Sequence, residues 1–581
     1  MSGDGKQREP EPGRGDERPA TLDWRVRVLD PRTAVRRGGA RPPGPTTYVG
    51  DRVLLVGGDA DGAGLDEVAR VAAERGWTVR LEPGDVRDAG LLRQADLPRE
   101  TLAALSGPAG VLGTVGLRLE VAPGVAAPPP DAWELVEALE GRFAGGRVTL
   151  DHVLTATPAI GGAPYTEPHP YTEPHPYTEP HPYTEPHPYT EPHPYTEPHP
   201  AAGLAEYGRA GRGGRQPVTW VGPRPARRHA AGKVPLVTAD GLARPVVAVL
   251  DTGAGAHPWL GDDVVVRDPH VLGEPIGLYP APASAHADAD VGGTAVAPLT
   301  GGLDAAAGHG TFIAGLVHQL CPDAVVLACR LYGGEGVIPE WDLLRALRRL
   351  LLFHVLGLLG REGHHPVDVL CLSLGYYHER PEDETFDEPL ALALEVLRRH
   401  GVAVVVSAGN HGDPRPLYPA AFAPALDVST SPPVPLTPTE VTKDAPPIVS
   451  VGALNPDGTT ALFSNDGAWV TCRRPGAALV STLPTTMDGS LTPSRHLPGR
   501  SPGERRATID PDGFQGGFGV WSGTSFSAPV LAGELAARVL AEREQAGPVA
   551  ASGAGWPDVV AGRCAATWSA ITASTGLEPG A

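Results

Sequence analysis

Five short apolar runs, spread along residues 244–545, constrain the fold of this chain more than any other feature. They are VVAVLD, VVLACRLYG, VDVLCLSLG, VAVVVSAGN and PIVSVGAL. Continuous hydrophobicity, rich in β-branched residues and without polar alternation, is typical of parallel strands buried on both faces. Helical segments such as DEPLALALEVLRRHG lie between the runs. The alternation predicts an α/β domain with a doubly wound, mostly parallel sheet, whose strand ends carry loops for chemistry.

A second region of regular pattern precedes this domain, over residues 48–158. Its apolar runs and amphipathic stretches follow the order β-α-β-β-α-β, with one extra Leu-rich helical stretch in the middle. This order predicts a small ferredoxin-like α+β domain. An unrelated small α/β domain is the alternative.

The segments outside these two regions have the composition of irregular chain. Residues 1–47 are rich in Gly, Pro, Arg and Glu, and we expect them to be disordered. Residues 546–581 form a C-terminal tail rich in Gly, Ala and Ser, with one short helix near Cys564 as its only regular element.

Residues 159–243 are predicted to link the two domains, and they contain six consecutive copies of YTEPHP, from Tyr165 to Pro200. Two prolines in every six residues exclude a helix or a central strand and leave extended, polyproline-like chain. The six repeated histidines suggest metal capture as an alternative. In a straight polyproline helix they would lie about 19 Å apart, too far to share one ion. We therefore predict a linker, and no metal or cofactor anywhere in the chain.

Charge and cysteine content exclude several classes of function. Lys and Arg number 48 against 68 Asp and Glu, a net charge of −20, which argues against nucleic acid as a partner. The five cysteines show no CxxC spacing, so they indicate neither a disulfide framework nor a zinc site. The most apolar run, Leu350–Gly360, is too short to span a bilayer, and we predict no membrane partner.

The N-terminal residues contain no apolar segment of the kind that a secretory signal needs. We therefore expect a cytoplasmic protein, with an unusual export route as the alternative. The oligomeric state is left open.

Three polar residues in the α/β region have the chemistry of nucleophilic acyl transfer. Asp251 ends a strand-like run, and His309 and Ser525 each stand at the start of a helical pattern. A serine hydroxyl is a weak nucleophile unless a neighbouring base removes its proton. An imidazole can do so near neutral pH, and a carboxylate can orient that imidazole and stabilise its cation. Asn410, at another strand end, could donate its amide to the developing oxyanion together with the Ser525 backbone N–H.

Each of these residues alone also fits a structural role: a turn residue, a satisfied packing histidine, or a helix cap. Their order along the chain, Asp then His then Ser, is the order of subtilisin rather than of chymotrypsin or the α/β-hydrolases. Four such residues in one domain therefore favour the catalytic interpretation.

The blocks around these residues resemble the subtilisin-like serine peptidases, or subtilases. The resemblance rests on five blocks: VVAVLDTGAGAHPWL, GHGTFIAGLV, LSLG, VVSAGN and GTSFSAPVLAG. It implies a triad of Asp251, His309 and Ser525, with Asn410 as oxyanion donor, in an endopeptidase acting on polypeptide substrates. It also implies two substrate-binding segments. Ser373, Leu374 and Gly375 would form an edge that pairs with the substrate backbone. Ser407, Ala408 and Gly409 would form one wall of the P1 pocket.

The resemblance extends to the N-terminal region, because many subtilases carry a ferredoxin-like propeptide that assists folding and inhibits the enzyme. VTLDHVLTA, at 148–156, is similar to the end of such propeptides. Two further functions remain as alternatives: a dedicated processing peptidase for one intracellular partner or precursor, and a peptide-binding module with an idle triad. Carboxylates at 285–290 could bind a cation, but a solvated loop is the favoured interpretation.

Overall fold

The computed structural model of the chain describes part of its 581 residues. The described ranges are 25–36, 42–56, 63–105, 113–140, 147–156, 207, 214–230, 232, 236–280, 282, 284–380, 388–427, 429–430, 433–437, 441–547 and 555–579. The YTEPHP repeats lie outside the described residues. No described helix is long and apolar enough to cross a membrane.

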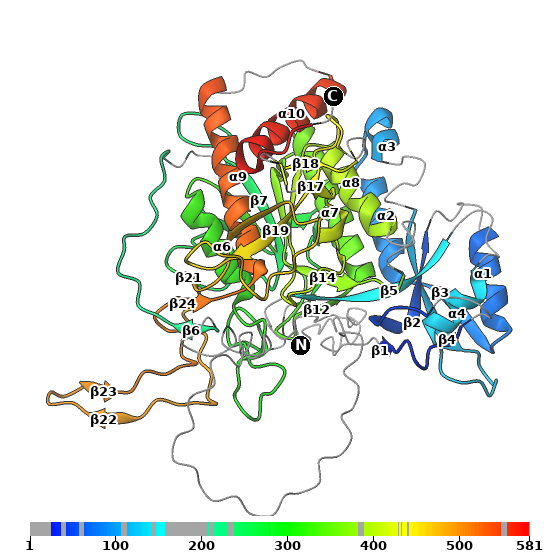
Figure 1. The fold of residues 1–581 in the computed structure, drawn as a ribbon, viewed down its shortest axis with the longest axis horizontal. Coiled ribbons are helices and arrows are strands. Elements are labelled where there is room, and N and C mark those ends of the chain that lie inside the picture. Colours follow the sequence, from blue (N-terminus) through cyan, green and yellow to red (C-terminus); the bar gives the residue numbers. More distant parts are fainter. Residues whose placement is uncertain are drawn as a thin grey trace, which may run out of the picture.

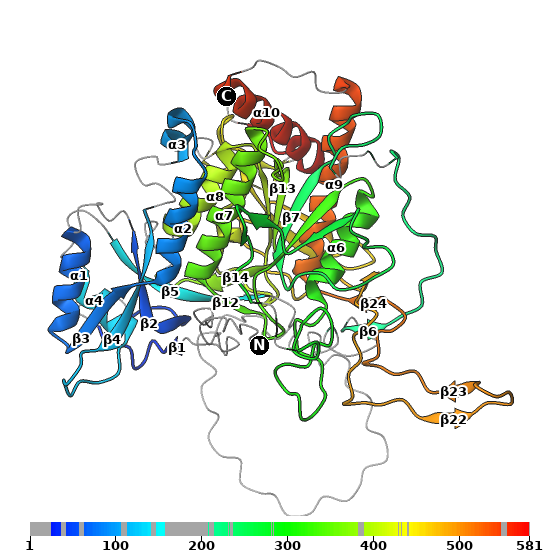
Figure 2. The same ribbon diagram turned by 180° about the vertical axis from the view of Figure 1, so that it is seen from behind.

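The α/β domain is built around a seven-stranded sheet in the order β20-β19-β15-β13-β7-β11-β8 (Figures 1 and 2). Every neighbouring pair in this sheet is parallel. Its strands are β7 (Val246–Asp251), β8 (Val265–Arg267), β11 (Val325–Arg330), β13 (Val369–Leu372), β15 (Ala403–Ser407), β19 (Ile448–Leu454) and β20 (Cys472–Pro475). The predicted fold class is confirmed.

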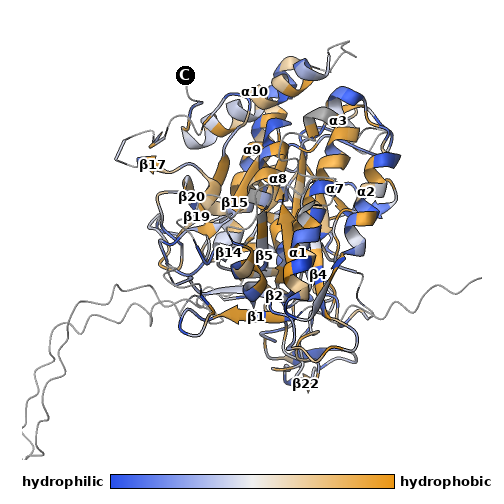
Figure 3. Cartoon of the chain, turned by 90° about the vertical axis from the view of Figure 1, so that its right-hand side faces the viewer, coloured by the Kyte–Doolittle hydropathy of each residue, from blue (hydrophilic) through white to orange (hydrophobic). Residues whose placement is uncertain are grey.

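Helices cover both faces of this sheet, because alternate side chains of each buried strand point to opposite sides. Along β7, Ala248 and Leu250 belong to a core shared with α7 and α8, whereas Val247 and Val249 belong to a second core shared with α6 and α9. Hydrophobic residues follow the central strands in Figure 3. The helices are α6 (His309–Leu320), α7 (Glu340–Leu358), α8 (Glu388–Arg399), α9 (Thr524–Ala546) and α10 (Trp556–Thr575).

Short strands and one 3₁₀ turn surround the main sheet. They are β6 (Gln216–Pro217), β9 (His270–Val271), β10 (Glu274–Pro275), β12 (Val337–Pro339), β14 (Leu374–Tyr377), β16 (Leu417–Tyr418), η1 (Ala420–Phe422), β17 (Leu426–Asp427), β18 (Val434–Pro435), β21 (Leu479–Thr482), β22 (His496–Pro498), β23 (Arg505–Ala507) and β24 (Phe518–Trp521).

The N-terminal module is a separate layer of antiparallel strands and helices with its own apolar core. Its four central strands follow the order β5-β2-β4-β3, each antiparallel to its neighbour, as in a ferredoxin-like β-α-β-β-α-β unit. The elements are β1 (Val26–Leu29), β2 (Thr46–Val56), α1 (Ala63–Ala73), β3 (Trp77–Leu81), α2 (Pro83–Gln94), α3 (Arg99–Leu105), β4 (Val115–Val121), α4 (Ala132–Leu139) and β5 (Arg147–Ala156).

The last strand of this module, β5, continues into the α/β domain. Beyond its pairing with β2, it lies between β12 and β14 and is antiparallel to both. One hydrogen-bonded sheet thus joins the two domains (Figure 1).

Two segments that the sequence assigned to irregular chain contain regular structure, and a predicted helix in a third is longer than expected. β1 lies within residues 1–47 and pairs with β2. β6 lies within the proposed linker and pairs with β24, because Arg215 beside it donates to the backbone carbonyls of Asp304 and Ala307 and holds the segment against the domain. In the tail, the short helix expected near Cys564 is α10, which is 20 residues long and packs on α9.

Candidate active site

Asp251 and His309 meet at the carboxyl edge of the main sheet. Asp251 is the last residue of β7, and His309 is the first residue of α6, after Gly308 in the left-handed region at φ 76°. His309 Nδ1 lies 2.8 Å from Asp251 Oδ1 and 2.9 Å from Oδ2. Both side chains are buried, and His309 Nε2 has no hydrogen-bond partner among the described residues. An imidazole oriented in this way presents Nε2 as a base.

Two further residues hold the Asp251 carboxylate in place, and the sequence analysis missed both. The Tyr332 hydroxyl donates to Oδ2 at 2.6 Å, and the Thr252 backbone N–H donates to Oδ1 at 2.8 Å. Burial and the nearby Asp251 charge hold the pKa of Tyr332 well above its usual range, so the phenol keeps its proton. The position of Tyr332 just after β11 is the signal that could have identified it. Arg330 at the end of β11 is in register with Asp251 on the adjacent strand, so the residues that follow β11 lie near Asp251.

Ser525 is the second residue of α9 and is fully buried. Its backbone carbonyl accepts a hydrogen bond from Ser373 Oγ at 3.1 Å. The next residue, Phe526, lies against His309 with the ring centroids 5.2 Å apart. The first turn of α9 therefore lies beside the histidine, and a helix N-terminus favours developing negative charge.

Asn410 is fixed by Thr524, the residue before Ser525. Asn410 Oδ1 accepts from the Thr524 backbone N–H and from its hydroxyl, each at 2.8 Å. The Thr524 hydroxyl also accepts from the Gly409 backbone N–H at 3.0 Å. Because the carbonyl side of the Asn410 amide is used twice, its NH₂ side is directed away from Thr524. Thr524 is a second residue that the sequence analysis did not single out.

The loop at 285–290 supports the histidine helix. Asp290 is buried and accepts from the Thr311 backbone N–H and hydroxyl, at 3.2 and 2.5 Å, in the first turn of α6. Burial raises the pKa of its carboxyl. Asp288 pairs with Arg330 at 2.9 Å. These carboxylates are engaged by protein groups, contrary to the favoured interpretation of a solvated loop.

The predicted substrate-pairing edge is already paired in the structure. Leu374 and Gly375, in β14, are in register with Ala156 and Thr155 of β5. On the other side of β5, Thr155 is in register with Val337 of β12. A strand of the N-terminal module thus lies where an extended substrate was expected.

The predicted pocket wall lies at the end of β15. Ser407, Ala408 and Gly409 are in line with this buried strand, and Gly409 has φ 102°. A side chain at Gly409 would come within 2.4 Å of the Asn465 amide. Glycine is therefore required there.

A buried charged cluster ties β5 to the α/β domain. His152 Nδ1 lies 2.8 Å from Glu340 Oε2, and Nε2 lies 2.8 Å from Glu379 Oε2. Burial opposes the charge of this imidazole, but the two carboxylates outweigh it and hold the pKa of His152 well above its usual range. Although burial acts in the opposite direction, His152 and His378 lower the pKa of Glu379 to about 2.

The same cluster contains the metal-compatible group found among the described residues, His152, His378 and Glu379, whose ligand atoms lie within 4.8 Å of one another. Both ring nitrogens of His152 are already within hydrogen-bond distance of carboxylates. His152 is therefore an imidazolium held between the carboxylates of Glu340 and Glu379.

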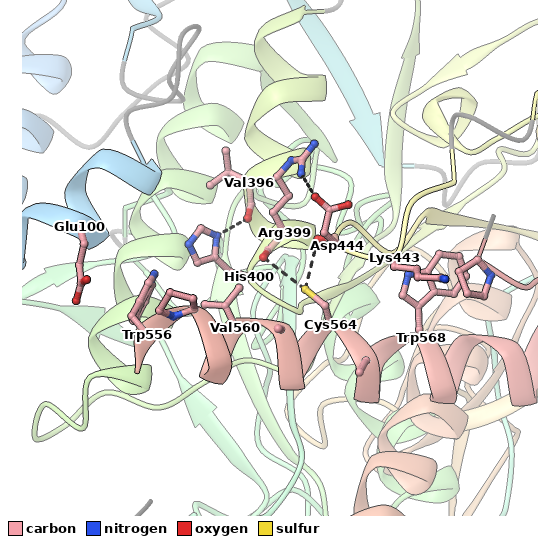
Figure 4. A pocket seen from close by; sticks show the side chains of 14 residues that line it. Glu100, Val396, Arg399, His400, Lys443, Asp444, Trp556, Val560, Cys564 and Trp568 are labelled. Carbon is pink, nitrogen blue, oxygen red and sulfur yellow. Dashed lines mark hydrogen bonds and ion pairs between the residues drawn. The ribbon is translucent and has the colours of Figure 1, made fainter. Parts of the chain in front are cut away.

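A cavity of about 880 Å³ lies elsewhere, between α8, α10 and the N-terminal module (Figure 4). Cys564 faces it with its thiol against the backbone carbonyls of Arg398, Arg399 and Asp444. Burial raises the pKa of this thiol and lowers that of the neighbouring His400. Among the described residues that line the cavity, the Cys564 thiol is therefore not activated as a nucleophile.

Comparison with known families decides the affiliation. The model of the subtilase family matches residues 243–559, more than half of the chain. The chain belongs to the subtilase family.

Two individual subtilases match this chain at 24% and 25% identity. The Major intracellular serine protease of Bacillus subtilis (strain 168) is 24% identical over 199 residues, which are 32% of this chain and 50% of that protein. Subtilisin BL of Lederbergia lenta is 25% identical over 254 residues, 42% of this chain and 68% of that protein. The chain thus spans about half the length of the first relative and two thirds of the second.

Among solved structures, fervidolysin from Fervidobacterium pennivorans, a keratinolytic enzyme related to subtilisin, is similar with a TM-score of 0.41 and 15% identity. The alignment covers 89% of this subtilase and 57% of fervidolysin.

Proposed function

We propose that this subtilase is a serine endopeptidase in which Ser525 attacks the scissile carbonyl. The observation that carries the proposal is the buried contact of His309 Nδ1 with the Asp251 carboxylate, at 2.8 and 2.9 Å, beside the first turn of α9. His309 Nε2 takes the Ser525 proton as the bond to the carbonyl carbon forms, and Asp251 stabilises the resulting imidazolium. His309 then gives that proton to the leaving amine. Water hydrolyses the acyl-enzyme by the same route in reverse.

The oxyanion of the tetrahedral intermediate is assigned to Asn410 and to the Ser525 backbone N–H. Thr524 supports this assignment because it holds the Asn410 carbonyl oxygen and so fixes the orientation of the amide. One such donor is worth about 10²- to 10³-fold in kcat.

The proposal includes an inhibitory role for residues 48–158. β5 pairs with Leu374 and Gly375 as an extended substrate would, and the adjacent Ser373 contacts the Ser525 carbonyl. Backbone pairing of this kind gives affinity without reading side chains, so an inhibitory strand and a substrate compete for the same edge. Ser407, Ala408 and Gly409 would line the P1 pocket beside that edge.

We retain the cytoplasm as the proposed location. The name of one relative, the Major intracellular serine protease, agrees with it.

The test is labelling of the purified chain with a fluorophosphonate probe, together with intact mass measurement. We expect wild type to be labelled once and Ser525→Ala not at all. Ser527→Ala is the matched control, because Ser527 lies on the same helix and its hydroxyl donates to a backbone carbonyl there. Labelling of Ser525→Ala equal to wild type, or no labelling of either, would contradict the proposal and favour an idle peptide-binding domain.

A further inference from the structure

A β-hairpin, the arm, projects from the α/β domain between β21 and β24 and comprises residues 488–513. Asp488 and Gly513 bridge at its base, and β22 pairs with β23 along its length. Both strands are exposed at every residue. An isolated two-stranded hairpin is marginally stable in water, because it has no third strand or helix to pack on. The arm therefore has the form of an element that contacts a partner.

The acidic side chains of the arm bond to its own backbone, whereas its arginine side chains face the solvent. The Glu504 carboxylate accepts from the backbone N–H groups of Arg500 and Ser501, at 2.8 and 3.0 Å. Carboxylates of Asp510 and Asp512 likewise accept from the backbone N–H groups of the opposite strand. The acidic side chains thus hold the hairpin together.

The arginines have no such role. Arg495, Arg500, Arg505 and Arg506 are all exposed, and none has an ion-pair partner among the described residues. The whole arm carries four cations and four anions, 4 − 4 = 0, because Asp488, Asp510 and Asp512 lie near its base. Its outer part, residues 495–507, carries the four arginines and one anion, Glu504, a local charge of 4 − 1 = +3 in a chain of net charge −20. At physiological ionic strength, charges more than about 8 Å away are screened, so a ligand at the outer part of the arm experiences this local positive charge.

Apolar side chains lie among these arginines. Leu497 is in register with Arg506, so the two lie on the same face, and Arg495 is two residues from Leu497 on that face. Leu497 is 61% exposed, and Ile509 near the base is 85% exposed. Arginines around an exposed leucine fit an extended peptide that carries carboxylates and a few apolar side chains.

The direction of β5 shows which part of a substrate would reach the arm. β5 runs along β14 toward Ser373, which contacts Ser525. A substrate bound in the same direction has its N-terminal part on β14 and its C-terminal part beyond Ser525. The arm arises there, from β24, whose Trp521 packs against the His309 ring. Figures 1 and 2 show the arm and the N-terminal module on opposite sides of the α/β domain.

We propose that the arm is an exosite that binds an acidic, extended segment of the polypeptide substrate on the C-terminal side of the scissile bond. This inference rests on the proposed peptidase function and names its substrate class. Such a site would favour selected proteins over general digestion, which agrees with a dedicated processing peptidase.

Binding is measured first, because it does not require catalysis. The probe is a fluorescent peptide with six glutamates, and its glutamine counterpart is the control ligand. In the Ser525→Ala full chain, replacement of Arg495, Arg500, Arg505 and Arg506 by Ser should weaken binding of the acidic peptide at least about 10-fold. Replacement of the exposed Arg70, Arg80, Arg93 and Arg361 by Ser changes the net charge equally and should change binding less than about 2-fold.

Equal binding by the two quadruple variants would overturn the exosite whatever the activity of the enzyme. Arm-dependent binding of a DNA duplex or of phosphatidylserine vesicles, without binding of the peptide, would overturn it too.

Hydrolysis then tests the position of the exosite. For the active chain, kcat/KM of a peptide with glutamates C-terminal to the cleaved bond should fall about 10-fold in the arm variant. The same glutamates placed N-terminally, or a short neutral peptide, should show no dependence on the arm, and an equal fall for both placements would contradict the assigned side. If wild type hydrolysed no peptide and Ser525 were not labelled, the peptidase function would be contradicted. The binding result would still decide the exosite.

Discussion

The helices that cover the two faces of the main sheet differ in the side chains with which they pack. On one face, α9 packs through Leu531, Leu535 and Val539 in a continuous apolar core that also includes Trp568 of α10. On the other face, α7 is apolar toward the sheet and contacts the N-terminal module through apolar and charged side chains together.

The contact of α7 with the module combines apolar packing with buried ion pairs. Asp88 of α2 accepts from Arg345 Nε and Arg349 Nη2, each at 2.7 Å, and Asp85 accepts from Arg348 Nη1 at 3.3 Å. An apolar face requires permanent cover, whereas a charged face is well hydrated when its cover leaves. The difference indicates that α9 and α10 belong to the permanent core of the domain, and that the module occupies an interface able to open.

Breaking the charged face should give the largest effect. Asp88→Asn leaves Arg345 and Arg349 buried without a full counter-charge and should weaken docking of the module by about 3–5 kcal/mol. We would measure hydrogen exchange at the β5 amides in the Ser525→Ala background, where exchange should accelerate while the α9 amides stay protected. Arg70→Gln, in an exposed pair on α1, is the control and should change nothing beyond about 0.5 kcal/mol. Equal acceleration in α9 would mean that the module is part of the permanent core.

The apolar face should respond in the opposite way. Leu535→Ala leaves a cavity in the core beneath α9 and should lower the free energy of unfolding by about 2–5 kcal/mol. Chemical denaturation measures this loss. Exchange in β5 should stay slow under native conditions. Undocking of β5 without loss of global stability would reverse the comparison.

The proposed catalytic residues lie at strand ends between the two faces, and Tyr332 tests how Asp251 is held there. Tyr332→Phe removes one donor to Asp251 and keeps the ring, so the loss, about 1–2 kcal/mol, should appear as about a 10-fold lower kcat/KM. An unchanged kcat/KM would mean that Tyr332 is only a packing residue.

The smallest predicted effect is the pH dependence of the charged interface. The pKa of His152 is raised in the docked state above its ordinary value of 6.5, so its contribution is complete below pH 6.5 and is lost as the pH rises through the raised pKa. The pKa of Glu379, lowered from 4.5 to about 2, gives a contribution that is present above pH 4.5 and is lost as the pH falls toward 2.

Glu340, Tyr376 and His378 are the other groups that face His152. We therefore expect the tightest docking between pH 4.5 and 6.5, and release in alkaline solution. His152→Gln should weaken docking and remove its alkaline limb, as measured by hydrogen exchange across pH. An alkaline limb that persists in this variant would assign it to another group.

The sequence predicted the features that depend on local pattern. The buried strands, the strand-end Asp251 and the helix-start His309 and Ser525 were all visible in short segments. The contacts of Tyr332 and Thr524 could not be seen in short segments. Tyr332 lies 81 positions from its partner Asp251, and Thr524 lies 114 positions from its partner Asn410.

Two further segments show the same limit. α10 was predicted only as a short helix because it has no clear amphipathic pattern, since few of its residues, among them Trp568 and Ile571, are buried. β6 is a two-residue strand held by Arg215, whose partners are backbone carbonyls that no sequence pattern reveals. Such elements depend on tertiary contacts rather than on local propensity.

The central claim is that β5 occupies the substrate edge of a competent Ser525 site and is held there by the charged interface. Its most direct test is the initial rate of hydrolysis of a short peptide with a large apolar P1 residue, in wild type and in Asp88→Asn. We predict a rate at least about 10-fold higher in Asp88→Asn, abolished in both by Ser525→Ala. Equal rates, with β5 shown to be undocked in Asp88→Asn, would contradict the claim.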